Sequence, residues 1–196
     1  MIYLTERLLQ FQKLAPGIVK VKYHHDDDWD LYLDLSHFQK PVDMSLVLPH
    51  YRAYRQPVEH RMSMFIASHS EQTKLKICRP VSSSRFYLEL RASTSNITVW
   101  LPSDFKGQIR HTGKAVFSSG FVNRIMRNVQ INNHVEYESP MHDSVFVYTT
   151  GQVTFRMWDV RTRAPEIPHK EAIKRVFGCT RRAPETAIDW DFLLED

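Results

Sequence analysis

The sequence predicts an all-β protein, either an antiparallel sandwich or a short β-solenoid, with small helices near both ends. Apolar and polar residues alternate over about ten short segments, as in strands with one buried and one solvated face. Serine, asparagine and aspartate cluster between these segments and mark turns. Buried strands do not alternate with long amphipathic helices, which argues against doubly wound folds and α/β barrels.

A short helix is expected at residues 5–14. Thr5 is a suitable N-cap, and Leu8 and Leu9 begin a loose apolar face on the same segment. Pro16 ends the helix, because proline cannot continue it.

The expected strands follow this helix, and the period of the apolar residues changes to two. These strands lie at residues 18–23, 31–35, 62–66, 75–77, 86–90, 97–101, 129–131, 145–149 and 153–157. Segment 97–101 resembles segment 153–157, and segment 75–80 resembles segment 97–102. Stacked strand units would produce this similarity, although similar pairs also arise by chance in any β protein.

Residues 1–160 are expected to form a single β-rich domain, and residues 161–196 a helical and acidic extension packed on it. Pro168 marks a linker in the extension. A short helix is expected at 169–177, with Gly178 placed as its C-terminal cap.

Composition excludes several classes of protein. The chain has 196 residues, of which 42% are hydrophobic and 24% charged, and this excludes a disordered chain. Its net charge is +4, and residues 61–150 hold 11 basic and 6 acidic residues. This basic excess is small and dispersed, so it argues against a nucleic-acid partner.

Cys78 and Cys179 lie too far apart in sequence for a disulfide framework or a zinc-binding pair, so reduced thiols are expected. The first residues lack the apolar core of a secretion signal. No stretch of 18 apolar residues occurs, so no membrane span is expected. These features predict an intracellular, cytoplasmic protein.

The segment richest in potential metal ligands contains His24, His25, Asp26, Asp28 and Asp30. Carboxylates bind hard cations such as Mg²⁺ or Ca²⁺, and imidazoles bind transition metals, so this cluster is a candidate site for a divalent metal. The alternative is a solvated hairpin loop, because aspartate is favoured in turns.

The C-terminal residues contain a second candidate site. Asp189, Trp190 and Leu193 follow the pattern of a short acidic motif that docks on a partner by strand addition. The alternative is that the apolar side chains pack this end onto the domain.

No assembled catalytic motif occurs, and the catalytic residues stay unassigned. The sequence near Lys114 approaches a phosphate-binding loop, but Ala115 stands where serine or threonine must hold Mg²⁺. We therefore expect a non-catalytic binding or scaffold protein of unknown ligand, which could form homo-oligomers through strand edges. The alternative is an enzyme that modifies a small molecule in a β-lined cavity, with or without a metal.

Three segments carry a resemblance to a known family: residues 93–107, 117–121 and 151–157. Over roughly residues 60–160, the chain resembles an uncharacterised β-rich domain family of basidiomycete fungi. More remotely it is similar to putative adhesin domains of bacteria. The resemblance implies a β-rich fold and a fungal origin, and it implies no activity.

Overall fold

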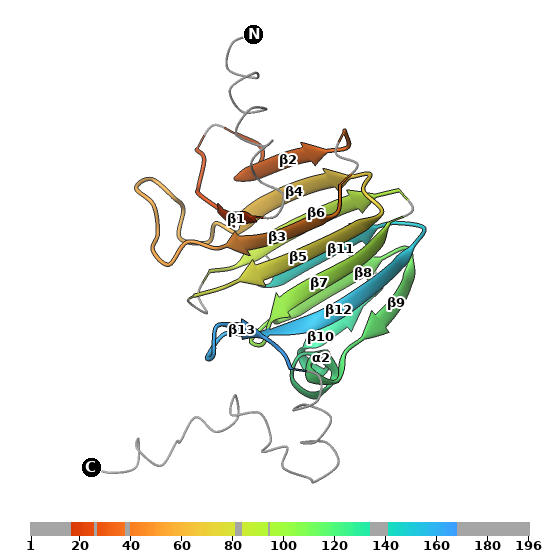
Figure 1. The fold of residues 1–196 in the computed structure, drawn as a ribbon. Helices are drawn as coiled ribbons and strands as arrows, with labels where there is room; N and C mark the ends of the chain where they lie inside the picture. The colour runs from red at the N-terminus through yellow and green to blue at the C-terminus, as the bar shows by residue number, and fades with distance from the viewer. Residues whose placement is uncertain are drawn as a thin grey trace, which may run out of the picture.

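A computed structural model of the chain describes residues 17–25, 27–37, 40–80, 84–93, 95–133 and 141–167. This part of the chain forms two β-sheets that face each other (Figure 1). The seven-stranded sheet contains β1 (Gly17–Lys20), β3 (Val42–Val47), β5 (Gln72–Cys78), β7 (Asn96–Pro102), β12 (Gln152–Asp159), β9 (Lys114–Phe117) and β13 (Ala164–Pro165). The six-stranded sheet contains β10 (Val129–Ile131), β8 (Gly107–His111), β11 (Asp143–Tyr148), β6 (Phe86–Ala92), β4 (Met62–Ser68) and β2 (Leu31–Leu35).

The chain crosses from one sheet to the other after nearly every strand. From β1 to β9, odd-numbered strands belong to the seven-stranded sheet and even-numbered strands to the six-stranded sheet. Neighbours within a sheet therefore point the same way, and strands of the two sheets point in opposite directions (Figure 1). The expected antiparallel sandwich is wrong, because every strand pair in the described residues is parallel except the short pairing of β12 with β13.

The last two long strands are inserted between earlier ones. In the six-stranded sheet, β11 lies between β6 and β8. In the seven-stranded sheet, β12 lies between β7 and β9. The strands β8, β9 and β10 therefore join the rest of the two sheets through β11 and β12.

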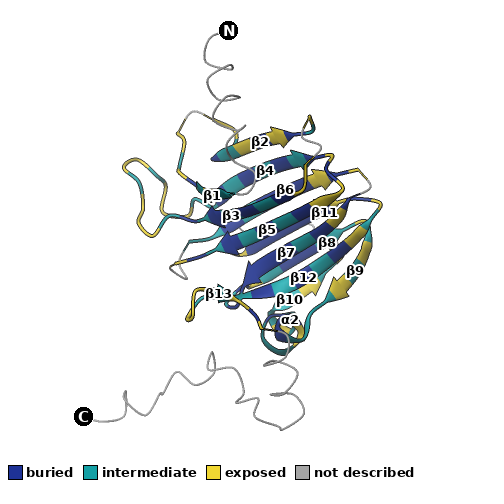
Figure 2. Ribbon diagram, viewed as in Figure 1, coloured by how far each residue is buried: buried dark blue, intermediate teal, exposed yellow. Residues whose placement is uncertain are grey.

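The core fills the space between the sheets. Buried and more exposed residues alternate along the strands (Figure 2). The side chains buried between the two sheets form one continuous cluster, made mostly of Leu, Ile, Val, Met and Phe. Met64, Leu88 and Val145 lie side by side in register on the six-stranded sheet, each fully buried. Burial of one such side chain stabilises the fold by about 1.5–3 kcal/mol.

A short helix, α2 (Ser119–Arg124), follows β9 at the end of the sheets where β9 and β10 lie (Figure 1). The Ser118 hydroxyl accepts a hydrogen bond from the Phe121 backbone N–H at 3.3 Å and so caps the helix. Phe121 is fully buried, and its ring contacts those of Phe117 and Phe155. A single turn of 3₁₀ helix (Met126–Asn128) leads on to β10. Of the residues that the structure describes, none forms a helix long and apolar enough to cross a membrane.

Several local predictions can be compared with the strands. The expected strand at 31–35 coincides with β2, and the similar segments 97–101 and 153–157 are in-register neighbours, with Ile97 opposite Val153. The strands β3, β8 and β9 were not predicted. The expected helices at 5–14 and 169–177 lie outside the described residues. Part of the expected extension joins the seven-stranded sheet, because β13 pairs with β12.

Candidate functional site

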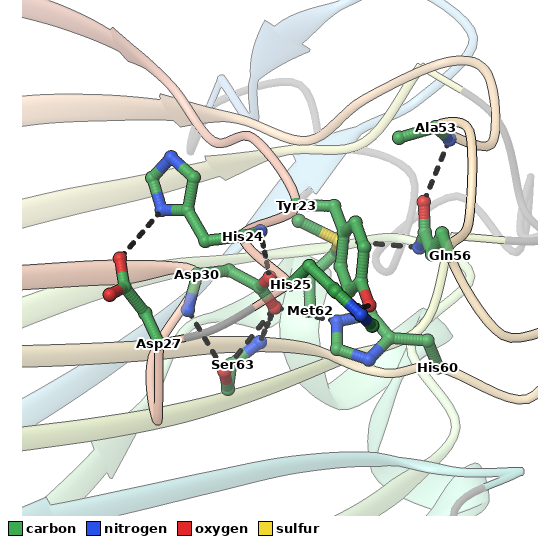
Figure 3. A network of polar contacts seen from close by, with 10 residues as sticks. All are labelled: Tyr23, His24, His25, Asp27, Asp30, Ala53, Gln56, His60, Met62 and Ser63. Atoms are coloured by element: carbon green, nitrogen blue, oxygen red, sulfur yellow. Dashed lines mark hydrogen bonds and ion pairs between the residues drawn. The ribbon is translucent and has the colours of Figure 1, made fainter.

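Two places in the described part of the molecule bring together side chains suited to bind a metal or another ligand. The first surrounds Asp30, just before β2, where the sequence predicts a metal site (Figure 3). Asp30 is 3% exposed, and its carboxylate accepts hydrogen bonds from the backbone N–H groups of His24 (3.0 Å) and Ser63 (2.8 Å) and from the Ser63 hydroxyl (3.2 Å). These bonds join the loop after β1 to β4 and satisfy a buried charge.

The same carboxylate fixes a histidine. Nε2 of His60 lies 2.7 Å from Oδ2 of Asp30, which accepts the hydrogen bond (Figure 3). The edge of the Tyr23 ring packs against the His60 ring, with centroids 4.7 Å apart and planes at 76°. A buried carboxylate that holds an imidazole in one orientation is a common arrangement in catalytic and binding sites.

The residues of the predicted metal site do not all point toward one centre. His24 lies 3.5 Å from Asp27, whereas His25 Nδ1 lies 3.0 Å from the Tyr23 hydroxyl (Figure 3). Asp28 is exposed, and Asp26 lies outside the described residues. Within the described ranges, no three His, Cys, Asp or Glu side chains are grouped closely enough to hold a metal ion. A metal site that includes Asp26 stays a prediction.

The predicted docking residues Asp189, Trp190 and Leu193 also lie outside the described residues. Their role as a docking motif therefore stays a prediction as well.

The second place is the outer face of the six-stranded sheet, which the sequence analysis missed. We call this surface the aromatic face, and it carries the rings of Trp29, Tyr32, Phe65, Tyr87, Phe146 and Tyr148. In-register parallel pairing places Tyr32 beside Phe65 and Tyr148 beside Arg91. Because neighbouring parallel strands lie about 4.8 Å apart, side chains in one row of the sheet touch.

Five of these rings form an unbroken series across the sheet. Tyr32 stacks on Phe65 with centroids 5.0 Å apart and planes at 9°. Trp29 then lies 5.4 Å from Phe65 and 5.8 Å from Tyr87, and Tyr87 lies 5.3 Å from Phe146. Tyr32 and Tyr148 are the most open of the six residues, at 54% and 44% exposure. Exposed aromatic residues gathered on one face mark a candidate binding surface.

Arginine side chains lie over the rings of the aromatic face. The Arg91 guanidinium is 5.5 Å from the Phe65 centroid and 5.7 Å from that of Tyr148. Its Nε donates a hydrogen bond to Glu89 at 2.6 Å. Arg61 and Arg110 lie over Tyr87 and Phe146 in the same way. These cation–π contacts and the ion pair hold the Arg91 guanidinium in place at the surface.

A groove of about 560 Å³ crosses one end of the aromatic face. Its walls include the rings of Tyr32, Phe65 and Tyr148, together with Asp34 and Arg91. Hydrogen bonds from Ser36, through both its side chain and its backbone, lower the pKa of Asp34 below its usual value of 3.8. Asp34 is therefore a charged acceptor at neutral pH, and Arg91 is a charged donor in the same groove.

The outer face of the seven-stranded sheet is different. Of its two described tryptophans, Trp158 in β12 is half-buried. Trp100 is only 7% exposed, and Lys76 and Arg156 lie over its ring at 5.5 and 5.3 Å. These cations cover the ring, so it presents little apolar surface to a ligand.

The aromatic face offers ring surfaces, a fixed donor and a fixed acceptor within one groove. Such a surface can bind a polar, non-ionic ligand that has both apolar C–H groups and hydroxyl groups. The sequence contains a signal for it, because an aromatic residue stands at an outward position in β2, β4, β6 and β11. That signal becomes informative only once the order and register of the strands are known.

Comparisons with known proteins give one positive result. A search of the curated proteins and a search of the solved structures each found no match. The profile of one protein family matches residues 19–142, which is more than half of the chain and takes in every strand from β2 to β10. The chain therefore belongs to the family defined by a domain of unknown function, DUF7330.

Proposed function

We propose that the protein is a non-catalytic binding protein whose aromatic face binds a neutral oligosaccharide. The observation that carries this proposal is the position of Arg91. Its guanidinium lies over both Phe65 and Tyr148, at the groove that Tyr32 and Asp34 also line. A ligand in this groove meets aromatic rings and two charged hydrogen-bonding groups at once.

Sugar rings match these features chemically. One side of a pyranose ring presents C–H groups, whose partial positive charge is attracted to the negative face of an aromatic ring. Its hydroxyl groups both donate and accept hydrogen bonds, so they can pair with the Asp34 carboxylate and the Arg91 guanidinium together. Tyr32 and Tyr148, at 54% and 44% exposure, present the two most open rings of the groove to the ligand.

The charges of the groove argue against a nucleic-acid ligand. Aromatic rings and arginines also bind single-stranded nucleic acids, by stacking on bases and pairing with phosphates. Here the carboxylate of Asp34 lines the groove, and that of Glu89 pairs with Arg91. Both carboxylates repel phosphate groups and leave little net positive charge for a polyanion.

A glycan array followed by calorimetric titration of the best neutral oligosaccharide tests the proposal. We expect Tyr32→Ala and Tyr148→Ala each to weaken binding at least tenfold, which corresponds to about 1.4 kcal/mol. Tyr54→Ala is the matched control, because Tyr54 is 89% exposed and lies in the loop between β3 and β4. Its affinity should equal that of the wild type.

The ligand class and the binding surface can each be rejected by a separate result. Binding of single-stranded RNA that is lost in the two tyrosine variants would keep the surface and reject the ligand class. An oligosaccharide affinity that all three tyrosine variants leave unchanged would reject the aromatic face itself.

The enzyme alternative and the remaining expectations from the sequence stay predictions. These are an intracellular, cytoplasmic location, a fungal origin, a likeness to bacterial adhesin domains and homo-oligomers formed through strand edges. The oligomer prediction is supported by the position of β1 and β2, which are edge strands of their sheets within the described residues.

A further inference from the structure

A second hollow lies on another part of the molecule and has a different character. It has a volume of about 240 Å³ and is bounded by the loop between β3 and β4 and by the residues just before β6. His50, Arg52, His60 and Arg85 line it. Among the described residues that line it, none is aspartate or glutamate. We call it the basic pocket.

The walls of the basic pocket are fixed by hydrogen bonds. The Ser84 hydroxyl donates to the Pro49 carbonyl at 2.7 Å, which ties the two sides together. Gln56 accepts from the Ala53 N–H at 2.9 Å and donates to the Met62 sulfur at 3.7 Å (Figure 3). A site that is already organised loses less conformational entropy when a ligand binds.

His60 links this pocket to the buried network around Asp30. Its Nε2 is bonded to the Asp30 carboxylate at 2.7 Å, so Nδ1 is the ring nitrogen that remains for a ligand. The Tyr23 ring packs against the imidazole and holds its plane. When the imidazole carries a proton on both nitrogens, Nδ1–H is a donor.

We propose that the basic pocket binds a tetrahedral oxyanion, namely the phosphate or sulfate group of a small molecule. Arg52 supplies a planar fork of N–H donors that matches two oxygens of such a group. His60, when both its ring nitrogens carry a proton, adds a donor whose orientation is set by Asp30. His50 and Arg85 add positively charged or basic groups to the walls. Asp30 is a positioning residue here, because His60 separates it from the ligand.

The test is a calorimetric titration of the full chain with inorganic phosphate, repeated with sulfate. Wild-type protein should bind one phosphate per chain, and Arg52→Gln should weaken this binding at least fivefold. Arg52 is exposed, so its replacement should leave folding intact. Arg161→Gln is the matched control, since Arg161 is an exposed arginine in the turn between β12 and β13.

The role of His60 is tested with His60→Gln and with Asp30→Asn, and thermal melts confirm that each variant is folded. Both should weaken phosphate binding, and the His60 variant more so. Saturable binding of phosphate in preference to sulfate, or the reverse, identifies which oxyanion the ligand carries.

Three outcomes overturn the proposal. They are an absence of saturable binding by the wild type, equal weakening by Arg52→Gln and Arg161→Gln, and full affinity in a folded His60→Gln variant. None of these outcomes bears on the aromatic face, which lies elsewhere and is tested with uncharged ligands.

Discussion

The guanidinium of Arg79 donates two hydrogen bonds to the carboxylate of Asp143, at 3.0 and 2.8 Å, and both side chains are completely buried. Arg79 follows β5 in one sheet, and Asp143 begins β11 in the other. The same guanidinium also bonds to Asp104 at 2.8 Å. Burial raises the pKa of Asp143, since the loss of water outweighs the attraction of Arg79. The pair therefore ties β11 to the opposite sheet.

Replacement of Arg79 by methionine should be strongly destabilising. Arg79→Met fills a similar volume but leaves the Asp143 carboxylate buried without its partner, which costs about 3–5 kcal/mol. Urea denaturation measures this loss, and Arg161→Met is the exposed control. The double variant Arg79→Met with Asp143→Leu should recover part of the stability. A loss below about 1 kcal/mol in the single variant would show that the pair behaves like an exposed ion pair.

Gly107, the first residue of β8, should not tolerate a side chain. Its φ is +149°, and a Cβ atom would lie 1.9 Å from the Asp143 carbonyl oxygen on the neighbouring strand. Because both groups are backbone, neither can move without breaking the sheet, and Gly107→Ala should cost at least about 3 kcal/mol.

Gly120→Ala is the comparison for this variant. There the Cβ would meet side-chain atoms of Glu166 and Met157, which can shift, so the loss of stability should be smaller. Thermal unfolding of the two variants shows which one loses more stability. A larger loss in the Gly120 variant would contradict the prediction.

Cys78 should be an unreactive thiol. Burial raises its pKa from 9.0 to about 11, so its thiolate population grows only as the pH approaches 11. At pH 9 about one molecule in a hundred carries the thiolate, compared with half for a thiol of ordinary pKa. The pH dependence of alkylation by iodoacetamide, measured in a Cys179→Ser background, should show this shift. The urea-unfolded protein is the control, and a folded-state midpoint near 9 would contradict the prediction.

The Asp30 network should stabilise the fold without a metal. The carboxylate already accepts hydrogen bonds from His24, His60 and Ser63, so we expect Asp30→Asn to cost about 1–3 kcal/mol. EDTA should leave the melting temperature of the wild type unchanged. A fall in melting temperature with EDTA that Zn²⁺ or Ca²⁺ reverses would instead support the metal site predicted at residues 24–30.

Most strand positions could be predicted from the sequence, apart from β3, β8 and β9, but strand direction could not. Leu31, Leu33 and Leu35 alternate with polar residues, and this pattern correctly predicts β2. A one-sided alternation usually accompanies antiparallel pairing, because parallel sheets are mostly covered on both faces. In this fold a parallel sheet has one solvated face, so the usual association between pattern and direction fails.

The aromatic face could not be predicted because it depends on register. Tyr32, Phe65 and Phe146 lie on three strands that are far apart in sequence, and each alone resembles an ordinary outward-facing residue. The basic pocket was equally hidden, since His60 gains its orientation from a contact with Asp30, thirty residues earlier. By contrast, the cluster of aspartates and histidines at residues 24–30 can be recognised directly in the sequence.

The inserted position of β11 and β12 has a consequence for how the chain acquires its structure. Strands β3 to β7 can add one after another as they leave the ribosome, since each pairs with a strand already made. The segment from β8 to β10 cannot join them until residues 143–159 have been synthesised. Closure of this long chain loop should therefore be the slow step of folding, and the pairing of β1 to β7 should form early.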